Sequence, residues 1–184
     1  MKKNLFHKEW SLFLDRDGVL NERIVDGYVT QRDELKIIDN TLSALMICQQ
    51  FFGWIFVVTN QQCIGKGVCS ANTIDDIHLY ISNLFQEQGV KIDAVYCCPH
   101  LASQNCDCRK PKIGLALQAK NDFPEIEFSK SLMVGDQLSD LMFGKNCNMK
   151  TVLVGEHALN PSKEMLKYAD YCFENLYNFV ENLK

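Results

Sequence analysis

The chain has 184 residues, of which 47% are apolar and 23% are charged, and its net charge is −4. Its length suits one domain with a full hydrophobic core, and its composition is that of a soluble globular protein. No apolar stretch approaches the roughly 20 residues that span a bilayer, and the acidic balance disfavours nucleic acid or an anionic membrane as a partner.

The N-terminal segment carries two lysines, as a secretory signal would, but His7, Lys8 and Glu9 interrupt the apolar run that a signal needs. We therefore expect a cytoplasmic protein. The rest of the chain contains no repeat, low-complexity segment or flexible linker. We expect a single domain over residues 1–184, present as a monomer.

Short apolar runs alternate with longer amphipathic stretches along the chain, and these patterns predict strands and helices respectively. Strands are expected at 11–14, 54–59, 92–97, 131–134 and 151–154. Helices are expected at 40–52, 72–88, 113–121, 163–168 and 175–183. The stretch from residue 156 onward is expected to add a closing strand and helix to the sheet.

Continuous apolar strands that alternate with helices predict an α/β fold, with helices on both faces of a mainly parallel sheet. In such a sheet the carboxyl ends of the strands lie along one edge, where ligands bind. Asp15, Thr59, the segment around Cys98 and Asp136 each follow a predicted strand. We therefore expect these four places, far apart in the sequence, to form one site.

The first place is Asp15-Arg16-Asp17-Gly18, where two carboxylates lie two residues apart. Phosphoryl transfer through a covalent intermediate needs one carboxylate that attacks phosphorus. It also needs a second group that protonates the leaving oxygen and then activates water. Gly18 allows the chain to turn close to a phosphate. An ordinary exposed turn explains this motif about equally well when it stands alone.

Two polar motifs further along the chain suit an anion. Thr59 and Asn60 follow the second strand and offer hydrogen bonds to a phosphoryl oxygen, although helix capping uses the same residue types. Arg109, Lys110 and Lys112 form a short basic segment. A fixed ammonium there neutralises charge on a transferring group, and an arginine grips a second anion. A solvated basic loop is the alternative for this segment.

The last motif ends an apolar run with Gly135-Asp136 and continues to Asp140. The two carboxylates are four residues apart and share a face if a helix begins there. Magnesium prefers oxygen ligands and keeps several waters, so Asp15 and Asp136 together with a phosphate oxygen suffice to hold it.

In this order, the four motifs resemble those of the haloacid dehalogenase-like (HAD) superfamily of phosphatases, over roughly residues 12–154. The resemblance implies that Asp15 is the nucleophile and that Asp17 is the general acid/base. It further implies that Thr59 and Lys110 stabilise the phosphoryl group. The residues that it assigns to the magnesium site are Asp15, Asp17 (through its backbone carbonyl) and Asp136, with Asp140 behind them.

A cysteine-rich segment at about residues 97–110 extends the resemblance to one subfamily of the superfamily. Cys98 and His100, followed by Cys106 and Cys108, are similar to the structural zinc loop of one HAD subfamily. Three thiolates and one imidazole make a closed tetrahedral site, which suits structural rather than catalytic zinc. The chain has nine cysteines, and this odd number without an export signal argues against a disulfide framework.

The spacing of the motifs leaves no room for a large cap domain, because one helix and one strand use up the chain between Asp15 and Thr59. We expect the zinc loop to shape the substrate pocket instead, by fixing Arg109 and Lys110 at its mouth.

Two groups within this subfamily differ in substrate. The stretch from residue 57 to 67 resembles the heptose bisphosphate phosphatases, although Gln62 and Cys63 replace the Ser-Gly of that group and Lys66 replaces an arginine. The five-residue spacing in the zinc loop is instead typical of histidinol-phosphate phosphatases. We favour the bisphosphate. The residues expected to bind substrate are Asn60, Gln61, Gln62, Arg109, Asp26 and Tyr28.

Charge distinguishes these two substrates. A bisphosphate needs a second anion site, for which Arg109, Lys112 and Lys66 are available. Histidinol phosphate carries cationic groups and needs a carboxylate there, for which Glu22 and Asp26 are available. Two other hypotheses are weaker. The acidic charge disfavours a nucleic-acid end phosphatase, and the complete set of catalytic residues disfavours a non-catalytic, zinc-bearing interaction module.

Overall fold

A single six-stranded sheet forms the centre of the protein in this computed structural model, which describes residues 6–183. The strands are β1 (Ser11–Leu14), β2 (Trp54–Asn60), β3 (Ala94–Cys98), β4 (Ser131–Gly135), β5 (Lys150–Leu153) and β6 (Tyr171–Cys172). All neighbouring strands pair in parallel, in the order β3-β2-β1-β4-β5-β6. The predicted strands are thus confirmed, with β6 as the closing strand.

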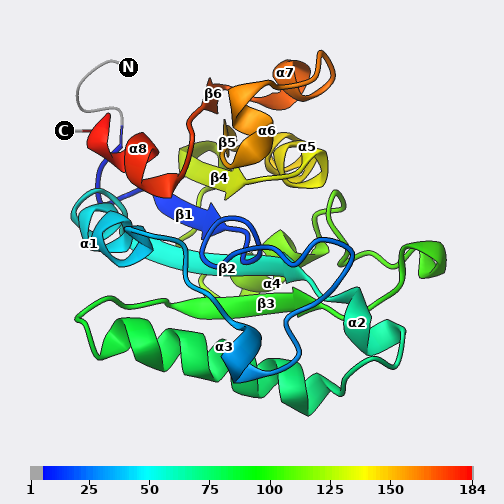
Figure 1. The fold of residues 1–184 in the computed structure, drawn as a ribbon. Helices are drawn as coiled ribbons and strands as arrows, with labels where there is room; N and C mark the ends of the chain where they lie inside the picture. The colour runs from blue at the N-terminus through cyan, green and yellow to red at the C-terminus, as the bar shows by residue number, and fades with distance from the viewer. Residues whose placement is uncertain (1–5, 184) are drawn as a thin grey trace.

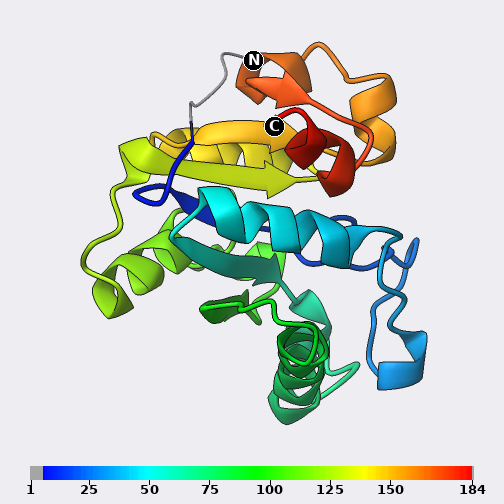
Figure 2. The ribbon, with the colours of Figure 1, turned by 90° about the vertical axis from the view of Figure 1, so that its left-hand side faces the viewer.

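Helices cover both faces of the sheet (Figures 1 and 2). They are α1 (Thr41–Phe51), α2 (Gln62–Gly65), α3 (Ala71–Gln86), α4 (Gly114–Asp122), α5 (Leu138–Asn146), α6 (Glu156–Leu159), α7 (Met165–Tyr168) and α8 (Leu176–Glu181). Short 3₁₀ turns lie at Arg32–Glu34, Ala102–Gln104 and Phe128–Lys130. The one-turn helices α2 and α6 are too short to leave a periodic pattern, and the sequence analysis did not predict them.

The two core layers follow from the alternation of side chains along each strand. Leu12 and Leu14 of β1 join the core beneath α1, α3 and α8, whereas Phe13 between them joins the core beneath α4 and α5. Because both faces are covered, β1 is apolar and buried at every position, which explains its continuous apolar run.

The start and end of α3 show how the sequence sets a helix. The Ser70 hydroxyl accepts a hydrogen bond from the backbone N–H of Thr73 at 3.1 Å, which satisfies one of the free donors of the first turn. Just beyond the helix, Gly89 has a φ of +78°, which glycine adopts without steric cost.

Within residues 6–183, no helix is long and apolar enough to cross a membrane.

The strand order reverses direction at β1. From β1 the chain builds β2 and β3 on one side and then returns to place β4 on the other side. The arrowheads of these strands point the same way in Figure 1, so their carboxyl ends share one edge. Ligands of open α/β sheets bind at such a reversal, because the loops diverge there and leave a crevice. No large cap domain interrupts the part of the chain that the structure describes.

Candidate active site

Three buried carboxylates meet where β1 and β4 end. Leu14 of β1 pairs with Val134 of β4, and the backbone N–H of Asp15 donates to the Val134 carbonyl at 2.9 Å. This pairing brings the residues that follow the two strands side by side. Asp15, Asp136 and Asp140 each offer a carboxylate oxygen, and these oxygens lie within 4.8 Å of one another.

One buried cation lies among these acids. The Lys110 Nζ is 2.8 Å from Asp15 Oδ1 and 2.7 Å from Asp140 Oδ1, and it donates to the Val58 carbonyl at 2.7 Å. Burial raises the pKa of Asp15 to about 6, although the charge of Lys110 opposes this rise. The site therefore holds a buried carboxylate beside a fixed ammonium, an arrangement that suits phosphoryl transfer.

Asn60 sets the position of Lys110. Its side-chain Oδ1 accepts from the Lys110 backbone N–H at 3.1 Å, and its Nδ2 donates to the Lys110 carbonyl at 3.2 Å. Asn60 also lines the cavity described below. The residue predicted to bind substrate thus also clamps the backbone of the catalytic candidate Lys110.

The Asp17 carboxylate is turned towards the protein. Arg16 Nη2 donates to both of its oxygens at 2.9 Å, Asn21 Nδ2 donates to Oδ1 at 2.8 Å, and Gln61 Nε2 donates to Oδ2 at 2.8 Å. Burial alone would raise the pKa of Asp17, but the charge of Arg16 and these hydrogen bonds hold it below its ordinary value. Its carboxylate is therefore ionised in the resting protein.

A buried Arg16–His78 contact supports Asp17 from behind and was not found from the sequence. Arg16 is only 1% exposed, and its Nη1 lies 3.2 Å from Nε2 of His78, on α3. Burial and the charge of Arg16 lower the pKa of His78 to about 3, so the ring is neutral and accepts from the guanidinium. The signal in the sequence was a histidine on the otherwise apolar face of α3.

We expect His78→Gln to flatten the dependence of stability on pH. The pKa of His78 is lower in the fold than in the unfolded chain, so its neutral form contributes stability above about pH 6.5 that is lost as pH falls towards 3. Between pH 7 and pH 4.5 the wild type should lose about 2 kcal/mol more unfolding free energy than the variant, by urea denaturation. The exposed His157→Gln is the control, and parallel profiles for His78→Gln and wild type would contradict the expectation.

An open cavity of about 410 Å³ lies over this edge of the sheet. Asp15, Asp17, Thr59 and Lys110 line it together with Asp140. Four residues predicted to bind substrate also line it, namely Tyr28, Asn60, Gln62 and Arg109. Residues that follow β1, β2, β3 and β4 in the chain thus line one cavity.

Two predicted substrate residues lie elsewhere. Gln61 is 1% exposed and donates to Thr59 Oγ1 at 2.9 Å as well as to Asp17, so its side chain holds these residues from behind and is not available to a substrate. Asp26 is exposed, has a φ of +55° and is outside the cavity lining. Neither side chain lines the cavity in this arrangement, and the role of these two residues in binding substrate stays a prediction.

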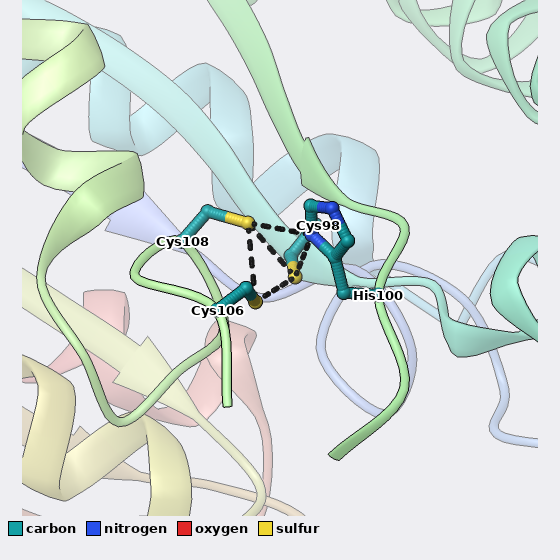
Figure 3. A group of neighbouring side chains, drawn as sticks. All are labelled: Cys98, His100, Cys106 and Cys108. Carbon is teal, nitrogen blue, oxygen red and sulfur yellow. Dashed lines mark hydrogen bonds between the residues drawn. The ribbon is translucent and has the colours of Figure 1, made fainter. Parts of the chain in front are cut away.

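The cysteine-rich segment forms a second cluster, beyond the end of β3. Figure 3 shows the sulfurs of Cys98, Cys106 and Cys108 converging with Nδ1 of His100. The sulfur–sulfur distances are 3.1–3.5 Å, and Nδ1 lies 3.2 Å from the Cys108 sulfur. Four soft donors around one point fit zinc. Arg109 follows directly, and its Nη1 donates to the His100 carbonyl at 3.3 Å, which ties the cluster to the cavity wall.

The acidic cluster fits magnesium by the chemistry of its donors. Three buried carboxylates carry more negative charge than Lys110 balances, and oxygen ligands are those that magnesium prefers. Gly18 has a φ of +91°, and a Cβ there would lie 2.4 Å from Asp136 Oδ2. Only glycine allows the backbone after β1 to approach Asp136 this closely.

Arg23 also contacts this cluster and was not singled out from the sequence. Its Nε lies 2.9 Å from Asp136 Oδ2, and its Nη2 donates to Asp136 Oδ1 at 3.1 Å. The residue lies in a loop between two predicted elements, where no motif marks it.

Comparison with known proteins agrees with this geometry. A HAD-hydrolase-like family model matches residues 107–178. The protein named D-glycero-alpha-D-manno-heptose-1,7-bisphosphate 7-phosphatase in Mycobacterium tuberculosis is 41% identical over 138 residues, covering 75% of this chain and 73% of the relative. The Pasteurella multocida protein named as the phosphatase of the beta form is 32% identical over 180 residues, covering 95% and 96%.

Solved structures show the same fold. The D,D-heptose 1,7-bisphosphate phosphatase from B. bronchiseptica, solved with magnesium and phosphate, superposes with a TM-score of 0.84 at 27% identity, over 95% of this chain and 97% of that one. The resemblance inferred from the motifs is confirmed. This chain belongs to the HAD superfamily of phosphatases, in the family of proteins named heptose-1,7-bisphosphate 7-phosphatases.

Proposed function

We propose that this chain hydrolyses D-glycero-D-manno-heptose 1,7-bisphosphate to the heptose 1-phosphate, with magnesium at Asp15 and Asp136. The observation that carries this proposal is the charge of the cavity wall. Arg109 and Arg23 line the cavity, whereas Glu22 and Asp26 do not. A second phosphate therefore finds a cation, while the cationic groups of histidinol phosphate would find no carboxylate away from the reacting end.

The two other basic residues suggested for the second phosphate contact other groups of the protein. Lys66 lies over the Tyr28 ring, 5.2 Å from its centroid, and Lys112 donates to the Asn105 carbonyl at 2.7 Å. Neither is among the residues that line the cavity. Of the three cations suggested from the sequence, Arg109 is the one that lines the cavity, which supports its proposed role.

The proposed mechanism has two half-reactions. In the first, an Asp15 oxygen bonds to phosphorus as the bond from phosphorus to the sugar oxygen breaks, and Asp17, which has first taken up a proton from solvent, gives that proton to the sugar oxygen. In the second, Asp17 takes a proton from water, which attacks phosphorus and releases Asp15. Lys110 and Thr59 stabilise the charge on the phosphoryl oxygens. Magnesium, when bound, would neutralise the same charge and orient the phosphate.

Asp17 has to turn for this role. Its carboxylate is ionised and bound to Arg16, Asn21 and Gln61 in the resting protein, yet the residue lines the cavity. When Asp17 rotates towards the cavity it would leave the Arg16 charge that lowers its pKa, take up a proton from solvent and donate it to the substrate oxygen. Apo sites commonly lack the hydrogen bonds that the substrate complex makes.

Zinc bound by Cys98, His100, Cys106 and Cys108 would hold the cavity wall and take no part in the chemistry. We expect Cys106→Ser to raise KM about tenfold with a smaller change in kcat, because the loop positions Arg109 through the His100 carbonyl. Steady-state kinetics and bound zinc are measured together. Cys172→Ser, outside the cluster, is the control. Unchanged KM, kcat and melting temperature after loss of zinc would rule this role out.

The decisive assay is phosphate release from both anomers of the heptose bisphosphate and from L-histidinol phosphate, with magnesium and with EDTA. We expect a kcat/KM at least a hundredfold higher for a heptose bisphosphate, and loss of release in EDTA. A higher kcat/KM for L-histidinol phosphate would leave the assignment as a phosphatase intact but would reject the heptose bisphosphate as its substrate. A KM that does not change with salt separates this activity from a nucleic-acid end phosphatase.

A further inference from the structure

The carboxylate proposed to bind magnesium already holds a cation. Arg23 contacts both oxygens of Asp136, through Nε at 2.9 Å and Nη2 at 3.1 Å, and Gln137 Nε2 donates to Oδ2 at 2.8 Å. This two-point contact is the fork geometry with which arginine binds carboxylates and phosphates. Magnesium at Asp136 would share an oxygen that the guanidinium already contacts and would place two cations side by side, so binding of the metal disfavours this contact.

The charge of the site explains why a cation is there. Asp15, Asp136 and Asp140 are buried within one cluster, and Lys110 balances only part of their charge. The Arg23 guanidinium lies against both oxygens of Asp136, where it balances charge that Lys110 leaves uncompensated. The guanidinium therefore does in the metal-free protein what a divalent cation does when bound.

The backbone around Arg23 is held while its side chain is exposed on one side. Asn21 Nδ2 donates to Asp17 and to the Glu22 carbonyl, both at 2.8 Å, and the Glu22 N–H donates to the Lys36 carbonyl at 2.7 Å. The Arg23 side chain is 43% exposed and lines the cavity. Rotation of the side chain about this fixed base is enough to move the guanidinium from Asp136 into the cavity.

We propose that Arg23 exchanges partners: it occupies Asp136 in the metal-free protein, and once magnesium takes Asp136 it binds a phosphate oxygen of the substrate. This inference rests on the proposed function, because it needs magnesium and a phosphorylated ligand at this site. Magnesium and the phosphate group then bind with positive coupling, since the metal frees the arginine that the phosphate uses. Such coupling is reciprocal, so phosphate also tightens magnesium.

The test uses titration calorimetry on the full chain. We expect Arg23→Ala to bind magnesium chloride alone three- to tenfold more tightly than wild type, because Asp136 no longer has to be vacated. With magnesium saturating, the same variant should bind inorganic phosphate at least tenfold more weakly, and the KM for the sugar bisphosphate should rise in parallel. The opposite directions of these two effects are the signature of the exchange.

Two further variants make the result specific. Arg32→Ala removes the same charge from an exposed side chain that lies over the Tyr80 ring, and it should change neither affinity. Arg23→Lys keeps the charge without the two-point contact, and it should recover part of the phosphate affinity. Magnesium affinity that is unchanged or weaker in Arg23→Ala would overturn the inference, as would phosphate binding that does not depend on Arg23. If the wild type itself shows no magnesium-dependent hydrolysis of the bisphosphate, the proposed function is rejected instead.

Discussion

Asp15→Asn is expected to lower kcat by at least about four orders of magnitude while the fold persists. The amide has nearly the same shape but is not a nucleophile, so neither half-reaction through an aspartyl-phosphate can occur. Burial raises the pKa of Asp15 to about 6, which means that its ionised form is costly in the fold at neutral pH. The melting temperature in EDTA at pH 7.5 should therefore not fall.

The measurement is phosphate release with magnesium, compared with Asp26→Asn, which makes the same chemical change on an exposed loop outside the cavity. The control should keep wild-type kcat. Retention of more than about a hundredth of the activity by Asp15→Asn would argue against the covalent route. If Asp15→Asn does not fold, the same measurement is made on Asp15→Glu.

Lys110→Met should have the largest effect on stability. It removes the only side-chain cation that contacts Asp15 and Asp140 in the described part of the chain and leaves two buried carboxylates without it. Breaking a buried pair in this way costs about 3–5 kcal/mol. We expect that loss in urea denaturation at pH 7.5 without magnesium, together with loss of catalysis.

The pH dependence of this loss identifies its cause. Without the ammonium, the pKa values of both carboxyl groups rise further, so the penalty should shrink as pH is lowered and these groups take up protons. The double variant Lys110→Met/Asp140→Asn should recover part of the stability at pH 7.5. Lys112→Met, two residues away with a side chain that is 40% exposed, is the matched control. A loss below about 1 kcal/mol for Lys110→Met would show that the ammonium does not hold the cluster.

The acid and thiol positions were accessible to sequence reasoning because they begin at the ends of strands, and Lys110 lies in the same segment after β3 as the thiols. A parallel sheet places the carboxyl ends of its strands on one edge, so Asp15, Thr59 and Asp136 had to be neighbours once the strands were recognised. The apolar runs identified these strands, since a strand covered on both faces has no polar alternation to confuse with a helix. The cluster of three cysteines and one histidine followed from their short spacing within one segment.

The roles of loop residues depended on tertiary contacts. Gln61 and Gln62 are adjacent in sequence, yet Gln62 lines the cavity while Gln61 is buried against Thr59 and Asp17. Which of two neighbours faces the ligand depends on how the chain turns after β2, and no periodic pattern records that turn. The loop from Glu22 to Thr30 shows the same dependence, because Ile24, Gly27 and Tyr28 line the cavity while the exposed Asp26 between them does not.

The sequence by itself determined the α/β class, the strand ends that form the candidate site, the donor types of the two candidate metal clusters and the superfamily. Only the tertiary structure decided that Arg16 and His78 support Asp17, that Asn60 clamps Lys110, and that Arg23 occupies Asp136. The physical reason is distance along the chain. Local periodicity and turn chemistry act between near neighbours, whereas these contacts join residues from separate elements and exist only after the sheet has assembled.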